Sequence, residues 1–127
     1  MPVTGFDERE RAMRQTPTAI GYLRKDISGV SQEWDEIQIR SRAKRLGYDL
    51  AKTVTFGAAT TDPEGRLVNV VQALDIDAVI APSLAHFGGL VPQRLVQQCE
   101  LNTVNPAETY APHAAFRFVD LDRTWPR

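Results

Sequence analysis

Side chains suited to phosphate chemistry follow three short apolar segments of the chain. Arg24 and Ser28 come after the first segment, Arg66 after the second and His86 after the third. An activated hydroxyl can attack phosphorus, and cations stabilise the charge that develops on the phosphoryl oxygens. The residue types therefore offer Arg24 and Ser28 as candidate catalytic groups and Arg66 and His86 as candidate anion-binding groups.

The segments that must position these side chains alternate between strand and helix patterns. Short apolar runs predict buried strands at 19–23, 53–56 and 77–81. A helix is expected from its N-cap at Ser31 to Gly47, with Trp34 and Ile37 off its apolar face. A second helix carries a stripe at i, i+3, i+4 and i+7, formed by Leu67, Val70, Val71 and Leu74.

The rest of the chain continues this alternation. Pro92 suits the first turn of a helix that carries Val91, Leu95 and Cys99 on one face. Weaker strands are expected near 103–110 and 115–119. The order predicts an α/β fold with three layers, in which helices flank a mainly parallel sheet of four to five strands.

In such sheets ligands bind at the C-terminal ends of the strands. Those ends are predicted to be the loops 24–29, 57–65 and 82–89. Any functional site should therefore lie where these three loops meet.

The length and composition of the chain limit the classes of protein to which it can belong. The chain has 127 residues, 43% of them apolar, and a formal net charge of −1. This size predicts a single domain over 17–127 after a flexible arm at 1–16, without a separate DNA-binding domain. The lone Cys99 excludes an intramolecular disulfide, and no secretory or membrane-spanning run occurs. We expect a cytoplasmic protein with no membrane partner.

The first and third strand-end loops resemble the catalytic domain of the serine recombinases, the resolvase and invertase family. Gly21-Tyr22-Leu23-Arg24 is similar to the start of the family's Gly-Tyr-x-Arg-x-Ser motif, and Leu84 matches the first residue of its Leu-Asp-Arg-Leu-x-Arg motif. The resemblance covers roughly residues 18–101 and includes Ile37-Gln38 and Gly47-Tyr48. It implies a resolvase-like fold and the attack of a serine on a DNA phosphodiester.

The chain departs from the family at most of the matched catalytic positions. Asp26 stands at the serine position, and the acid and two arginine positions hold Ala85, His86 and Gly89. Loss of one transition-state donor typically costs a factor of about 100 to 1,000 in rate. The resemblance therefore implies a non-catalytic member that acts as a binding or regulatory module without a cofactor. Independently of the resemblance, we expect Arg24 to pair with Asp26 or with an acidic neighbour.

Two other functions stay open. In one, the chain is an active recombinase or DNA-cleaving enzyme with a shifted nucleophile, Ser28 or Ser31, and with Arg66 as a displaced cation. In the other, the Ser-, Thr- and Gly-rich strand ends bind an anionic small molecule. No metal site is predicted, because neither His86 nor His113 has a second histidine or cysteine at ligand spacing.

Partners are suggested only by local features. The apolar tail, Phe116, Phe118 and Trp125, is a candidate surface for self-association or for a protein partner. Binding to DNA would need a local basic patch, since the net charge gives no general attraction. The basic residues from Arg40 to Arg45 spread over a wide arc of their helix, which favours a solvated face.

Overall fold

A five-stranded sheet forms the centre of the molecule in the computed structural model, which describes residues 16–111. Its order is β2-β1-β3-β4-β5, and the strands are β1 (Thr18–Arg24), β2 (Asp49–Phe56), β3 (Ala78–Ala81), β4 (Glu100–Thr103) and β5 (Glu108–Tyr110). The first four strands are parallel, and β5 pairs antiparallel with β4. The predicted mainly parallel sheet is confirmed.

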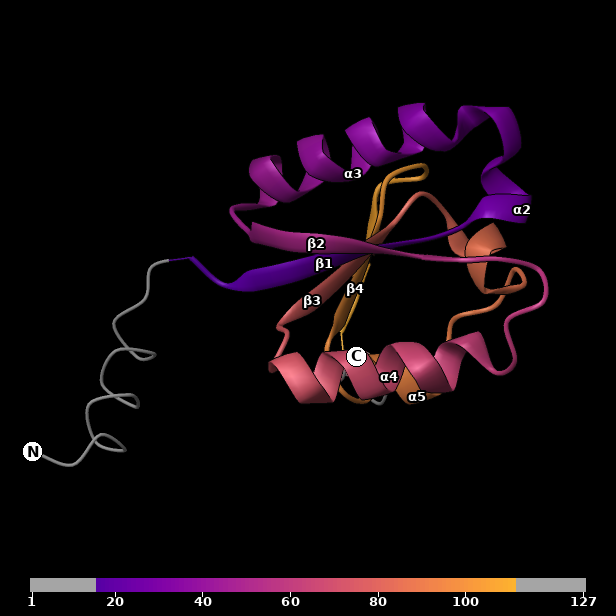
Figure 1. The fold of residues 1–127 in the computed structure, drawn as a ribbon. Helices are drawn as coiled ribbons and strands as arrows, with labels where there is room; N and C mark the ends of the chain where they lie inside the picture. The colour runs from indigo at the N-terminus through magenta and orange to yellow at the C-terminus, as the bar shows by residue number, and fades with distance from the viewer. Residues whose placement is uncertain (1–15, 112–127) are drawn as a thin grey trace, which may run out of the picture.

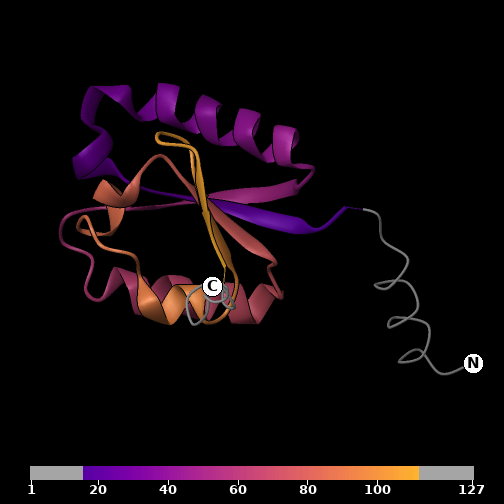
Figure 2. The ribbon, with the colours of Figure 1, turned by 180° about the vertical axis from the view of Figure 1, so that it is seen from behind.

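Helices cover both faces of this sheet, which gives the three predicted layers (Figures 1 and 2). The helix α3 (Gln32–Leu46) lies on one face, and α4 (Pro63–Leu74) and α5 (Gln93–Val96) lie on the other. Three shorter helical turns, α2 (Lys25–Ser28), η1 (Gly29–Ser31) and η2 (Leu84–Phe87), follow the C-terminal ends of β1 and β3.

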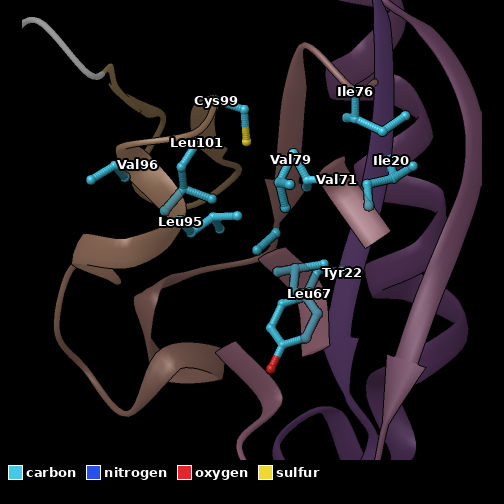
Figure 3. Packing of buried hydrophobic residues seen from close by; sticks show 11 residues of the cluster. Ile20, Tyr22, Leu67, Val71, Ile76, Val79, Leu95, Val96, Cys99 and Leu101 are labelled. Carbon is cyan, nitrogen blue, oxygen red and sulfur yellow. The ribbon is translucent and has the colours of Figure 1, made fainter. Parts of the chain in front are cut away.

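The larger apolar cluster fills the space between the sheet and the α4/α5 layer (Figure 3). Alternation along β1 sends Ile20 and Tyr22 into this cluster, while Ala19 and Leu23 point toward α3. The α4 stripe supplies Leu67 and Val71, both buried as the spacing predicts, whereas Leu74 is largely exposed. This cluster fixes the positions of β1 and β3, which carry the candidate site.

The α3 layer approaches the sheet closely at Gly21. A Cβ atom built on Gly21 would lie 2.7 Å from Thr53 Oγ1 and 2.8 Å from Ile39 Cγ2. Real Cβ atoms do not come that close, so only glycine lets α3 pack on β1 at this point. The glycine of the Gly-Tyr-x-Arg segment therefore has a packing role.

The predicted limits of α3 are confirmed. The helix follows Ser31 and ends at Gly47, whose φ of 85° is left-handed. Ser31 occupies the predicted N-cap position, but its side chain makes no capping hydrogen bond. Trp34 and Ile37 are exposed, as their place off the apolar face predicts.

Several predicted segments differ from the structure. Most of the loop expected at 24–29 forms α2 and the start of η1, and the loop expected at 57–65 ends at Asp62, whose carboxylate caps α4. The helix expected to carry Val91 and Cys99 is the single turn α5, so both residues lie outside it. The strand expected near 103–110 is two strands, because the chain reverses after Thr103, whose hydroxyl donates to the Pro106 carbonyl at 2.6 Å.

Several predictions fall outside the described residues. These are the arm at 1–16 except for Thr16, the strand at 115–119, His113 and the apolar tail.

Candidate functional site

The C-terminal ends of β1 and β3 lie side by side where the chain order of the sheet reverses. The connection from β1 to β2 runs through α3 on one face, and the connection from β2 to β3 runs through α4 on the other face. Such a switch point leaves a crevice outside the strand ends, where open α/β sheets bind their ligands. It is the place where the predicted site residues should meet.

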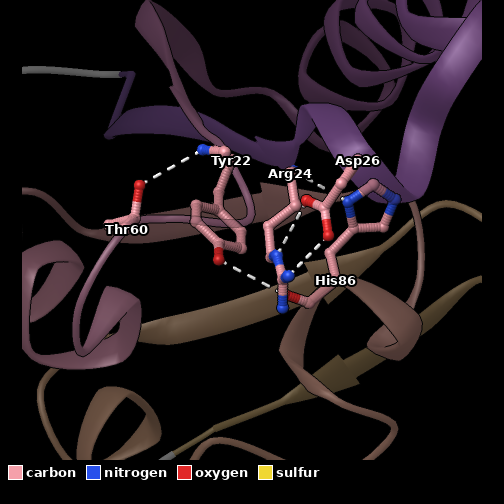
Figure 4. A network of polar contacts seen from close by, with 6 residues as sticks. Tyr22, Arg24, Asp26, Thr60 and His86 are labelled. Carbon is pink, nitrogen blue, oxygen red and sulfur yellow. Dashed lines mark hydrogen bonds and ion pairs between the residues drawn. The ribbon is translucent and has the colours of Figure 1, made fainter.

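His86 fills this crevice. Its Nδ1 accepts a hydrogen bond of 2.9 Å from the backbone amide of Arg24, and its carbonyl accepts one of 3.2 Å from the Tyr22 hydroxyl (Figure 4). Only 3% of the residue is exposed. The His86 side chain and backbone thus join η2 to the end of β1.

The same environment keeps His86 neutral. Burial lowers its pKa below the usual 6.5, and the nearby Arg24 cation adds to this, while Asp35 and Asp26 act against it. An Nδ1 that accepts a hydrogen bond carries no proton, so the neutral ring has its proton on Nε2. His86 therefore lacks the charge that its proposed anion-binding role would use.

Tyr22 connects the elements that surround His86. Its ring stacks on Phe87 with centroids 4.7 Å apart and meets Phe56 edge-on at 5.8 Å. Burial raises the pKa of Tyr22 to about 12, so its hydroxyl stays protonated and donates to His86. The tyrosine acts as a structural link between β1, β2 and η2.

Arg24 and Asp26 form a two-pronged ion pair beside His86. Arg24 Nε lies 3.1 Å from Asp26 Oδ1, and Nη2 lies 2.6 Å from Oδ2 (Figure 4). The Arg24 guanidinium holds the pKa of Asp26 below its usual range. The predicted pairing of Arg24 with Asp26 is confirmed, and an incoming phosphate would have to displace an internal carboxylate to bind the Nε–Nη2 edge of the guanidinium.

Ser28 is turned toward a different acid. Its hydroxyl donates a hydrogen bond of 2.6 Å to Asp35 Oδ2 on α3, and the residue is only 8% exposed. The shifted-nucleophile hypothesis requires an open hydroxyl with cations near it. The structure instead gives Ser28 a buried position and an anionic partner. Ser31, the other shifted candidate, is exposed.

Arg66 lies in another cluster, at the start of α4. Its Nε donates to the Thr61 carbonyl at 2.8 Å. It lines an open cavity of about 490 Å³ together with Asp62 and Arg94, whose side chains pair at 2.6 Å. Arg66 thus joins neither the Arg24–Asp26 pair nor the Ser28–Asp35 pair, and the four predicted residues do not form one site.

The loop after β3 holds the residues that stand at the positions of the second resembled motif. Gly89, at the final arginine position, has a φ of 86°, which is strained for any side-chain-bearing residue. Its amide donates to the Leu84 carbonyl at 2.8 Å and closes the turn. Ala85 donates its amide to the Ser83 hydroxyl at 3.2 Å. Ala85 and Gly89 therefore belong to a hydrogen-bonded turn, and neither of them carries a cationic side chain.

Sequence reasoning missed Asp35 and Tyr22 as members of this cluster. Asp35 follows Ser28 by two helical turns, but Gly29, with a φ of 55°, breaks the helix between them, so no single periodicity relates the two. Tyr22 lies in the Gly-Tyr-x-Arg segment, but its position in the sequence does not predict that its hydroxyl donates to the distant His86 carbonyl.

Searches against known protein families and against curated proteins find no match for this chain. Among residues 16–111, no group of three or more histidine, cysteine, aspartate or glutamate side chains could hold a metal ion. No helix in the same range is both long and apolar enough to cross a lipid bilayer.

Proposed function

We propose that this chain is a non-catalytic domain of the serine recombinase type that acts as a binding or regulatory module. One observation carries the proposal. The carboxylate of Asp26, at the position of the family's nucleophile, holds the guanidinium of Arg24 in a two-pronged pair. The side chain that should attack phosphate is thereby replaced by one that repels it.

The neighbouring groups support the same conclusion. Phosphoryl transfer needs several cations at the developing charge, and each lost donor costs a factor of about 100 to 1,000. His86 is neutral in the crevice, and Ala85 and Gly89 bring no charge. No single substitution would restore activity, because several cationic donors and the nucleophile are missing together.

A surface for a partner lies next to this closed crevice. The segment from α2 into α3 exposes large apolar side chains, namely Ile27, Val30, Trp34 and Ile37. Val30 is fully exposed, and Trp34 is 60% exposed. Exposed apolar patches mark interaction sites, and tryptophan often dominates binding energy at protein interfaces. We therefore assign a protein partner or a second copy of the chain to this side. The free, buried thiol of Cys99 accords with a cytoplasmic location.

A strand-cleavage assay with labelled supercoiled and linear DNA tests the loss of activity. Covalent protein–DNA adducts are read on denaturing gels. We expect none from the chain, and none from an Asp26→Ser variant, because a restored hydroxyl still lacks the second-loop cations. An adduct from the unaltered chain that disappears in Ser28→Ala and persists in Ser31→Ala would overturn the proposal.

One hydrogen bond favours the second candidate, a recombinase with Ser28 as the nucleophile. Asp35 accepts a hydrogen bond of 2.6 Å from the Ser28 hydroxyl and would act as its base if α2 opened. In that case Asp35→Asn would keep the hydrogen bond and remove the base, so it would abolish the adduct as fully as Ser28→Ala does. The same assay separates the two functions.

A further inference from the structure

A small cavity lies between α3 and the connection from β4 to β5, away from the switch point. Its volume is about 140 Å³, and its lining residues are Gln38, Ser41, Arg42, Arg45, Val104 and Ala107. The first four come from α3, and the last two come from the connection between β4 and β5. The cavity therefore has a polar wall on the helix and an apolar wall opposite.

The polar wall is suited to an anion. It holds two guanidinium groups, a hydroxyl and a side-chain amide, and no carboxylate is among the lining residues. All four side chains can donate hydrogen bonds, and guanidinium groups favour phosphate through their planar, forked geometry. Arg45 and Ser41 are exposed at the rim, while Arg42 and Gln38 are half-buried.

Arg42 provides an independent sign that an acceptor belongs here. Its Nε is buried, and it has no hydrogen-bond partner in the part of the chain that the structure describes. A buried donor without an acceptor destabilises a protein, and such a group calls for a physical explanation. Solvent does not reach Nε, so an anion in the cavity would become its acceptor only after the Arg42 guanidinium turns to present this donor.

We propose that this cavity binds the phosphoryl group of a small phosphate monoester. Two arginines match the charge of a dianion, whereas each phosphate of a DNA backbone carries one charge. The volume equals that of a few water molecules, at about 30 Å³ each, so it holds a phosphoryl group while the rest of the ligand extends outward. The site shares none of its lining residues with the switch-point crevice and does not depend on the resemblance to recombinases.

Titration with phosphate tests the site. Inorganic phosphate and glycerol phosphate are added at constant ionic strength, with chloride as the balancing salt, while the melting temperature and the ³¹P line width are followed. We expect saturable stabilisation and saturable broadening. Arg42→Gln and Arg45→Gln should each weaken binding about tenfold or more, as loss of a charged hydrogen bond predicts.

Arg40→Gln is the matched control. Arg40 is exposed, lies on the same helix and does not line the cavity, so its loss removes one charge without touching the site. Binding by this variant should equal that of the unaltered chain. Equal weakening in Arg40→Gln and Arg42→Gln, or no saturable response to phosphate, would overturn the proposal. Binding of duplex DNA that depends on Arg42 while phosphate has no effect would also overturn it, in favour of a nucleic-acid contact. Failure to bind phosphate would not bear on the proposed function, because the cleavage assay and the phosphate titration test different residues.

Discussion

At the scale of single residues, the exchange of a hydroxyl for a carboxylate at position 26 has two effects at once. It removes the nucleophile of the resembled motif, and it supplies a partner that occupies both prongs of the Arg24 guanidinium. The pair is partly exposed, so its contribution to stability is small. Its main consequence is for binding, because the Asp26 carboxylate occupies one forked edge of the Arg24 guanidinium and repels an anion that approaches the remaining donors.

His86 gives a second consequence at this scale, in the dependence of stability on pH. Its pKa in the folded chain lies below the unfolded value, chiefly because it is buried. Below about pH 6.5 the unfolded chain therefore binds more protons at this residue than the folded chain does. The stability linked to His86 is fully present above that pH and is lost as the pH falls through the folded pKa.

We expect a variant, His86→Asn, to lose less stability than the unaltered chain on acidification. Asparagine can accept the hydrogen bond from the Arg24 amide but does not titrate. The free energy of unfolding in urea, measured between about pH 7.5 and pH 5, gives the two slopes. The other titrating groups are common to both proteins, so parallel slopes would show that His86 keeps an ordinary pKa.

At the scale of elements, the packing of α3 on β1 depends on the absence of a side chain at Gly21. An added methyl group would meet Thr53 on the neighbouring strand and Ile39 beneath the helix, both closer than 3 Å. Neither neighbour is the free end of a flexible side chain. The strain must be relieved by movement of the helix or of β2, and overpacking of this kind typically costs about 1–3 kcal/mol.

Gly21→Ala is therefore expected to lower the free energy of unfolding by that amount, measured by guanidinium denaturation. Gly57→Ala is the control, because its added Cβ would meet only Lys25 Cε, at 3.9 Å, and its backbone is not left-handed. It should unfold at nearly the same denaturant concentration as the unaltered chain. Equal stability of Gly21→Ala and Gly57→Ala would mean that α3 does not press on β1 as described.

The same elements show what local patterns could predict and where they failed. The run 19–23 lies within β1, and the run 77–81 forms β3 except for the exposed Asp77, because the strand residues are buried on one side of the sheet or the other. The helix expected around Leu95 shrank to one turn, since Leu95 and Val96 are buried by position in the core rather than by a helical stripe. Short apolar runs do not distinguish these cases, because their burial is decided by distant segments.

At the scale of the molecule, the candidate site could be located from the sequence but not assembled from it. Alternation of strands and helices places ligands at the strand ends, and Arg24 and His86 do meet there. The pairing of side chains depends on the directions in which they point, and the spacing of residues in the sequence does not predict these directions. The hydrogen bonds of Ser28 to Asp35 and of Tyr22 to His86 join residues from separate elements. The cavity beside Arg42 arises only once the β4–β5 connection packs near α3.

The two apolar layers share the strand β1, so the described part of the chain should unfold as one unit. Ile20 and Tyr22 hold the α4 side of β1, and Ala19 and Leu23 hold the α3 side. Loss of either layer exposes β1, and a strand without one of its covering layers cannot keep the other. Damage to α4 should therefore be felt throughout the sheet.

Leu67→Ala tests this coupling. Leu67 is fully buried between α4 and the sheet, and such truncations cost about 2–5 kcal/mol. We expect the near-ultraviolet dichroism of the tyrosines and the far-ultraviolet dichroism of the backbone to shift to lower denaturant together, with coincident curves. Leu74→Ala removes the same atoms from an exposed position on the same helix, so its effect should stay within about 0.5 kcal/mol. A loss of the near-ultraviolet signal that precedes loss of the helices would show instead that the α4 layer melts on its own, and that β1 does not couple the two faces.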